Sequence, residues 1–145
     1  MRISKTSRGY VMRLDPGEPL VDALLAWARK EAPPAAEVRG IGALKDSEIG
    51  YFDLATKSYR TVLLPESMEL LQLQGNLAWV DGSDGGPREP ALHAHVVLAG
   101  PEMVARGGHL VSAVVSVTAE LFVEPLSPTL RRAPDEASGL KLLDL

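Results

Sequence analysis

The chain of 145 residues carries 15 basic and 19 acidic side chains, and its formal net charge of −4 opposes nucleic-acid binding over the whole surface. It contains no cysteine, which excludes disulfides, iron–sulfur clusters and thiolate zinc sites and leaves histidine and carboxylate as the strong metal ligands. No apolar run approaches the roughly 18 residues of a membrane span, and residues 1–8 lead into no signal-peptide stretch. We therefore expect a cytoplasmic protein that does not contact a membrane.

The first predicted elements are a short strand over residues 10–14 and a helix. Apolar side chains follow the i, i+3, i+4, i+7, i+8 spacing of one helix face at Leu20, Ala23, Leu24, Trp27 and Ala28. Asp15 is the expected N-cap, Pro16 the first helical residue and Glu18 the capping-box acid. Because Pro33 and Pro34 end the pattern, we expect one long helix with an apolar face to bury.

The remaining predicted elements are strands, bounded by turn signals such as the one over residues 81–87. They span residues 48–54, 58–64, 69–80, 92–98 and 113–123. Residues 40–43 lack the strand–helix context of a dinucleotide-binding fingerprint and are interpreted as a tight turn. Because the strands follow one another without helices between them, hairpin connections are expected. The sequence predicts an α+β domain with a mainly antiparallel, partly closed sheet and one long helix packed on it.

We expect residues 1–145 to form a single domain, since this length is common for one core and no long linker divides the chain. The tail over residues 127–145 begins like a loop but ends with four leucines, at Leu140, Leu142, Leu143 and Leu145. This end is too apolar to stay solvated, so the tail is expected to pack back on the domain or on a neighbouring subunit. A frayed terminus is the alternative.

All three histidines of the chain lie close together in sequence, at His93, His95 and His109. On a strand, side chains at i and i+2 share a face, so His93 and His95 present neighbouring imidazoles. Residues 99–103 have turn composition, and a returning strand would set His109 roughly opposite His93, with Cβ atoms about 4.5–5.5 Å apart. Three imidazoles at this spacing can bind one zinc ion and leave a coordination position open.

The predicted cofactor is thus a divalent metal, with zinc the first choice, bound by the three histidines. Glu69 and Glu120 lie on predicted strands and are candidates to accept the free N–H of a metal-bound histidine or to act as a general base. Facing solvent is the alternative for both carboxylates. For the histidines, the alternative is that they are ordinary polar residues on a sheet face.

Short motifs occur in order over residues 8–145. They are Gly40-Ile41-Gly42-Ala43-Leu44, Gly50-Tyr51-Phe52-Asp53, residues 69–76, residues 92–98, Gly107-Gly108-His109-Leu110 and Glu120. As a set they resemble the PPC domain, the plant and prokaryote conserved domain, in its stand-alone prokaryotic form. The resemblance implies an antiparallel sheet with a helix, a homotrimer, and retention of all three histidines. The family fold is similar to that of acetolactate decarboxylase, in which a histidine cluster holds zinc.

Two functions stay open at this stage. The first is a trimeric metal-binding protein of unassigned activity, with an enzyme acting on a small molecule as one form of it. The second is a DNA-associated or protein-interaction module, because the family is linked to DNA binding through plant members that carry an AT-hook. This chain has no Arg-Gly-Arg-Pro hook, and its acidic balance gives DNA binding little support.

Overall fold

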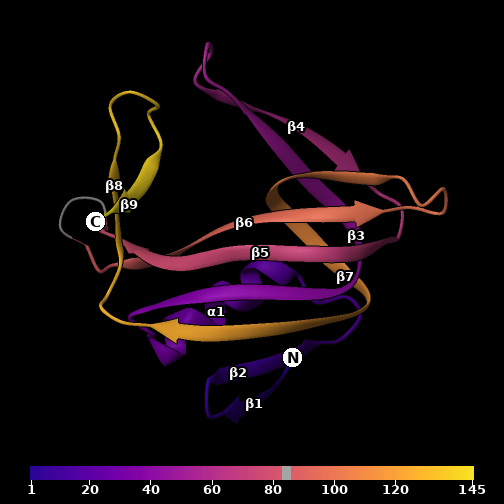
Figure 1. Ribbon diagram of the computed structural model, residues 1–145, viewed down its shortest axis with the longest axis horizontal. Coiled ribbons are helices and arrows are strands. Elements are labelled where there is room, and N and C mark those ends of the chain that lie inside the picture. The colour runs from indigo at the N-terminus through magenta and orange to yellow at the C-terminus, as the bar shows by residue number, and fades with distance from the viewer. Residues whose placement is uncertain (83–85) are drawn as a thin grey trace.

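In the computed structural model, which describes residues 1–82 and 86–145, nine strands form one sheet and a helix packs on it (Figure 1). The elements are β1 (Arg2–Thr6), β2 (Gly9–Leu14), α1 (Leu20–Glu31), β3 (Ala35–Asp53), β4 (Ser58–Leu64), β5 (Met68–Val80), β6 (Glu89–Ala99), β7 (Ala105–Leu126), β8 (Arg131–Pro134) and β9 (Lys141–Asp144). Of the turn predicted over residues 81–87, residues 83–85 lie outside the described part. No described helix is long and apolar enough to cross a membrane.

The predicted fold class, an α+β domain with a mainly antiparallel sheet and one long helix, is wrong. The protein is 65% strand and 8% helix, α1 spans 12 residues, and the nine-stranded sheet is mixed because β5 pairs with β8 in parallel. The missed strands include β1, β8, β9 and the first part of β3. Their local sequences carry weak strand signals, and their hydrogen-bond partners lie far away along the chain, where local propensity gives no information.

The helix begins later than predicted, at Leu20 rather than Pro16. Asp15 is not its N-cap: the Asp15 backbone N–H donates to the Glu18 carboxylate at 2.7 Å within a turn, and Pro19 occupies the N-cap position. The apolar face is as predicted, with four of its side chains buried, at Leu20, Leu24, Trp27 and Ala28. Burying each of the large ones contributes roughly 1.5–3 kcal/mol, which fixes the helix on one face of the sheet.

The sheet order is β1-β2-β7-β3-β5-β8-β9, and β6 pairs with both β5 and β7. Residues 40–43 are not a tight turn, because they lie inside β3, where the register against β5 shifts between Gly40 and Gly42. This bulge bends β3 without ending it. Pairing therefore runs from β7 through β3 and β5 to β6 and back to β7, and the ends of β6 and β7 are held on both sides.

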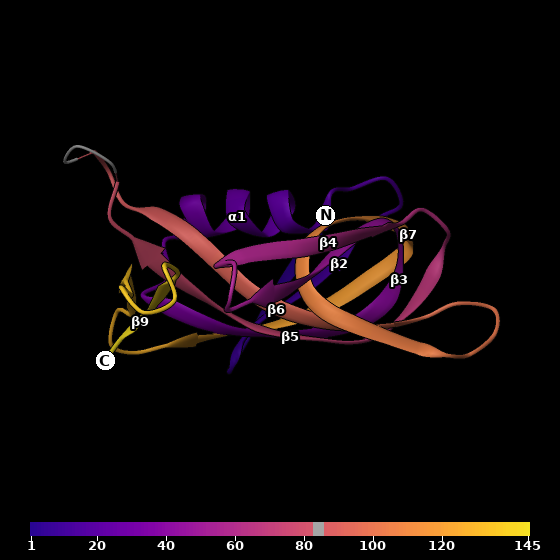
Figure 2. The same cartoon turned by 90° about the horizontal axis from the view of Figure 1, so that it is seen from above.

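The C-terminal residues form the hairpin β8–β9, which attaches to the end of β5. Trp79 and Val80 pair in parallel with Arg131 and Arg132, and the Trp79 N–H donates to the Leu130 carbonyl at 3.0 Å. Seen from above, this hairpin lies at one end of the sheet (Figure 2). The C-terminal hairpin therefore extends that end of the sheet, whereas the helix covers one of its faces.

Candidate metal centre

The three histidines come from the two strands of the β6–β7 hairpin. His109 is the direct partner of His95, and not of His93 as the sequence analysis expected. The pair next to the turn is Ala99 with Ala105. Counting four residues away from the turn on each strand leads to His95 on β6 and His109 on β7, which are therefore paired. The prediction misplaced the turn and so shifted the register by two residues, which still leaves all three side chains on one face.

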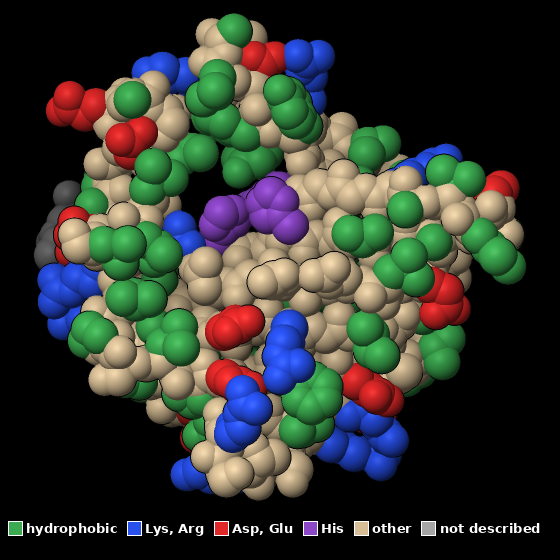
Figure 3. All heavy atoms as spheres, viewed as in Figure 1, with side chains coloured by type: hydrophobic (Ala, Val, Ile, Leu, Met, Phe, Trp, Pro, Cys, Tyr) green, Lys and Arg blue, Asp and Glu red, His purple; other side chains and the backbone are tan. Residues whose placement is uncertain are grey.

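Alternation along β6 explains why the histidines face outward. Ala94, Val96 and Leu98 are all buried in the core, so the intervening His93 and His95 point to the opposite face. In the space-filling view, the histidines lie in a hollow between the β3–β4 hairpin and the β8–β9 hairpin (Figure 3). The apolar packing beneath the sheet therefore fixes the backbone that carries the polar cluster above it.

The imidazole rings of His93, His95 and His109 are mutual neighbours. Their centroids lie 5.3, 5.4 and 5.6 Å apart, and one nitrogen from each ring falls within 4.8 Å of the other two. The Nε2 atoms of His93 and His95 are 3.3 Å apart. Two nitrogens bound to one tetrahedral zinc at about 2.0–2.1 Å also lie about 3.3–3.4 Å apart. The cluster is thus close to the dimensions of a metal site.

The surroundings of His109 and His93 favour the neutral form of these two imidazoles. Burial, aided by the nearby His93, His95 and Arg132, lowers the pKa of His109 to about 4. Burial and then Arg132 also lower the pKa of His93 below its ordinary value. A neutral imidazole keeps a lone pair for a ligand. The Nδ1 atom of His109 is buried and has no hydrogen-bond partner among the residues that the structure describes, so this cluster has unused polar capacity.

Close approach between strands sets the position of His109. A Cβ atom on Gly108 would lie 2.8 Å from the Gly50 carbonyl oxygen, so only glycine lets β7 pass this closely to β3. Gly50 is itself the direct partner of His109. From the neighbouring strand β4, the Tyr59 ring lies against the His109 imidazole with a centroid distance of 4.9 Å.

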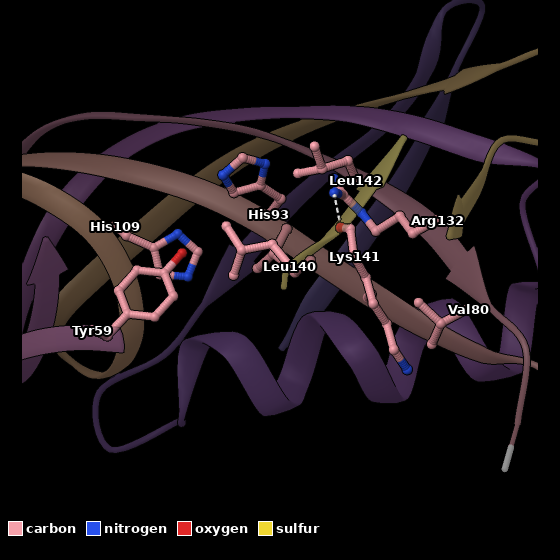
Figure 4. Close-up of a pocket in the computed structure, with 10 residues that line it drawn as sticks. Tyr59, Val80, His93, His109, Arg132, Leu140, Lys141 and Leu142 are labelled. Atoms are coloured by element: carbon pink, nitrogen blue, oxygen red, sulfur yellow. Dashed lines mark hydrogen bonds between the residues drawn. The ribbon is translucent and has the colours of Figure 1, made fainter. Parts of the chain in front are cut away.

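A cavity of about 270 Å³ opens beside the histidines. His93, His109 and Tyr59 line it from the sheet, and Arg132 and the β9 segment close the far side (Figure 4). The sequence analysis noted the apolar tail but did not select Arg132. No local sequence signal distinguishes it from its neighbour, since only the folded structure leaves Arg131 exposed and Arg132 half-buried.

The structure does not bring the two candidate carboxylates to the histidines. Glu69 is exposed at the far end of β5, opposite Ala99, and it lines a separate groove. Glu120 is exposed on β7 opposite Arg13, eleven residues along the strand from His109. Among the described residues, the cluster suited to a metal holds histidines alone.

Comparison with known families places the chain. The family described as the Plants and Prokaryotes Conserved (PCC) domain matches residues 1–127. The chain belongs to this family. The match confirms the resemblance drawn from the ordered motifs, since PCC and PPC name the same domain. The β8–β9 hairpin of this PCC-domain protein lies beyond the matched residues.

Solved structures agree with this membership. A plant- and prokaryote-conserved protein from Pyrococcus horikoshii is 36% identical, covers 99% of this chain and 94% of its own, and has a TM-score of 0.84. A metal-containing protein from Archaeoglobus fulgidus is also 36% identical, with full coverage of both chains and a TM-score of 0.84. A candidate DNA-binding protein from Bacteroides thetaiotaomicron is 26% identical, covers 99% of this chain and 96% of its own, and has a TM-score of 0.89. No functionally curated protein matches the chain.

Proposed function

We propose that this PCC-domain protein binds one divalent metal ion through His93, His95 and His109, and that this ion is zinc. The observation that carries the proposal is the grouping of three ligand nitrogens within 4.8 Å on one sheet face. Nothing in a purely structural role requires every histidine of the chain to meet at one point. The metal-containing relative from Archaeoglobus fulgidus supports the same reading.

The donor set fits such an ion. Imidazole nitrogens suit zinc and similar transition metals, and the lowered pKa values of His93 and His109 leave their lone pairs free at neutral pH. The Nδ1 of His109 has no hydrogen-bond partner among the described residues. The competing interpretation is a hydrogen bond between Nε2 of His93 and Nε2 of His95, which would leave His109 unexplained.

An ion held by these three histidines would supply Lewis acidity, and three protein ligands would leave a coordination position for water or a substrate. Tyr59 and Gly108 hold the His109 ring in place, and the apolar core below β6 keeps His93 and His95 on one face. This arrangement suits a metal-dependent enzyme that acts on a small molecule, and the reaction itself is left unassigned.

The test is metal content by elemental mass spectrometry on tag-free protein, comparing wild type with a His93→Ala/His95→Ala variant. A Gln72→Ala/Gln74→Ala variant is the matched control, because these side chains lie on the neighbouring strand β5 and are joined by a 3.0 Å hydrogen bond. We expect about one metal ion per chain in wild type and control, and none in the histidine variant. Metal-free wild type, or metal retained by the histidine variant, would overturn the proposal.

A DNA-associated module is the second candidate, and the description of the Bacteroides thetaiotaomicron relative is the observation behind it. Several arginines on the described surface are paired with acids: Arg8 and Arg39 share Glu124, and Arg60 binds Asp53. Pairing of this kind weakens phosphate binding. We expect no salt-sensitive rise in fluorescence anisotropy with duplex DNA at low salt, and a clear rise would favour this candidate.

We also propose that the protein forms a homotrimer, as the family resemblance implies. Three apolar side chains that line one groove are more than half exposed, at Ile41, Leu71 and Val117. Exposed apolar patches of this kind are typical of protein interfaces. Sedimentation equilibrium should give three times the chain mass of 15.5 kDa, and a monomer would contradict the proposal.

A further inference from the structure

We propose that the cavity beside the histidines binds a small monocarboxylate with a short aliphatic body, and that Arg132 is its anion-binding group. This inference rests on the proposed function, because the cavity lies beside the same histidines. It adds a ligand class and a binding residue that the metal proposal does not contain.

Arg132 is a half-buried cation with unused hydrogen-bonding capacity. Its guanidinium donates to Asn76 Oδ1 at 2.6 Å and to the Lys141 carbonyl at 3.1 Å. Its Nε atom is buried without an acceptor, and within residues 1–82 and 86–145 no carboxylate forms an ion pair with it. Since a partly buried charge without a counterion costs free energy, a bound carboxylate would offset that cost.

The position of Arg132 links it to the histidines. Asn76, which accepts from the guanidinium, is the direct partner of His93 on the neighbouring strand. Both Arg132 and His93 line the same cavity. In the close-up, the guanidinium lies beside Leu142 and the His93 ring, and the Lys141 side chain is directed away from the histidines (Figure 4). A ligand in this cavity therefore meets the cation on one side and the imidazoles on the other.

The rest of the lining determines the kind of anion. It is mainly apolar, with contributions from Val80, Leu92, Leu140 and Leu142. Of the two cationic side chains among the described lining residues, Lys141 is directed away from the histidines and Arg132 supplies one guanidinium, so the protein's own side chains match a monoanion better than a phosphate dianion. About 270 Å³ is enough for a branched chain of a few carbons. A carboxylate on a short aliphatic body satisfies both the charge and the walls.

The experiment uses isovalerate and its neutral isostere isovaleramide, each titrated into the full-length protein and followed by isothermal calorimetry. In ¹⁵N-labelled protein, the Nε–H signal of Arg132, assigned by its loss in Arg132→Gln, gives a second readout. The matched control is Arg131→Gln, since Arg131 neighbours Arg132 but is exposed. Metal content is measured on every sample.

We expect wild type and Arg131→Gln to bind isovalerate at least about 10-fold more tightly than isovaleramide. Arg132→Gln should weaken isovalerate binding about 10-fold or more and leave isovaleramide unchanged, because a hydrogen bond to a charged group contributes roughly 1.5–3 kcal/mol. Equal binding of the two compounds to wild type, or unaltered isovalerate binding by a folded Arg132→Gln, would overturn the inference. The wild-type comparison stands even if the variant fails to fold.

The binding experiment and the metal analysis can succeed or fail independently of each other. Isovalerate preference in protein that contains no metal would support the Arg132 site and contradict the metal site. Metal bound through the histidines, with no preference for isovalerate, would do the reverse.

Discussion

Two hairpins meet at the cavity, and they are held in different ways. The β6–β7 hairpin is paired on both sides within the sheet, and its inward side chains Ala94, Val96 and Leu98 are at most 2% exposed. The β8–β9 hairpin joins the sheet through two parallel pairs with β5, and its side chains are mostly exposed or half-buried. The first carries the histidines and the second carries Arg132.

The difference separates two tasks. Metal ligands need positions fixed to a fraction of an ångström, and a strand paired on both sides over a packed core provides them. A cavity wall needs shape and charge more than precision, so a lightly attached hairpin suffices. The hairpin lies beyond the residues matched by the family model, although the relatives from Pyrococcus horikoshii and Archaeoglobus fulgidus cover 99% and 100% of this chain.

The largest expected difference between the hairpins is in stability. Leu98→Ala removes a fully buried side chain from β6 and should lower the free energy of unfolding by about 2–5 kcal/mol. Leu142→Ala, on β9, truncates a side chain that is 44% exposed, and should cost less than about 1 kcal/mol. Urea unfolding of chelator-treated protein measures both. Equal losses would show that the hairpins are held equally firmly.

A pair of glycine variants tests whether backbone spacing serves the metal. Gly108→Ala forces a Cβ against the Gly50 carbonyl and should cost about 1–3 kcal/mol and weaken zinc binding, because it displaces His109. Gly139→Ala introduces strain at φ 78° in the C-terminal hairpin and should cost about 1–2 kcal/mol without affecting zinc. Zinc affinity by chelator competition decides between them. Full affinity in Gly108→Ala would mean that β7 tolerates the shift.

The same contrast explains how far the sequence could be interpreted. The helix face, β4 and the strand that carries His93 and His95 were predictable, because apolar periodicity is a local property. Clustering of the histidines was predictable for the same reason, since i and i+2 on a strand share a face. The partner of His95 depended on the length of one turn, and the prediction missed it by two residues.

Other features depend on contacts between distant segments. Residues 40–43 contain two glycines and are predicted to form a tight turn, yet pairing with β5 and β7 holds them in the bulged strand β3. Arg132 approaches His93 only because β8 pairs with the end of β5. The paired residues, such as Val80 and Arg132, are 52 positions apart in the sequence. No local pattern marks Arg132 as different from Arg131 until that pairing is known.

A smaller effect is expected at the wall opposite the C-terminal hairpin. Tyr59→Ala removes the ring that lies against His109 and should weaken zinc binding about 2- to 10-fold, because such aromatic contacts contribute about 0.5–1.5 kcal/mol. Tyr51→Ala, on the adjacent strand at a position that is 69% exposed, is the matched control and should leave affinity unchanged. Chelator competition measures both variants. If Tyr59→Ala binds zinc like wild type, the ring does not position His109.

The smallest effect is a pH dependence of the metal-free protein. Burial lowers the pKa of His109 in the folded state to about 4, and the titratable or charged groups that face it are His93, His95 and Arg132, whereas the unfolded chain takes up this proton near pH 6.5. Between these values the unfolded state binds more protons, so the contribution of His109 to stability is complete above about pH 6.5 and is lost as the pH falls toward 4. The melting temperature of chelator-treated wild type should therefore fall more steeply over this range than that of His109→Gln. Carboxylates with lowered pKa, such as Glu18 and Asp135, are present in both proteins, so their contributions cancel in the difference. Parallel melting profiles would mean that the folded protein admits the proton at His109, and that the sheet holds this imidazole less firmly than its surroundings indicate.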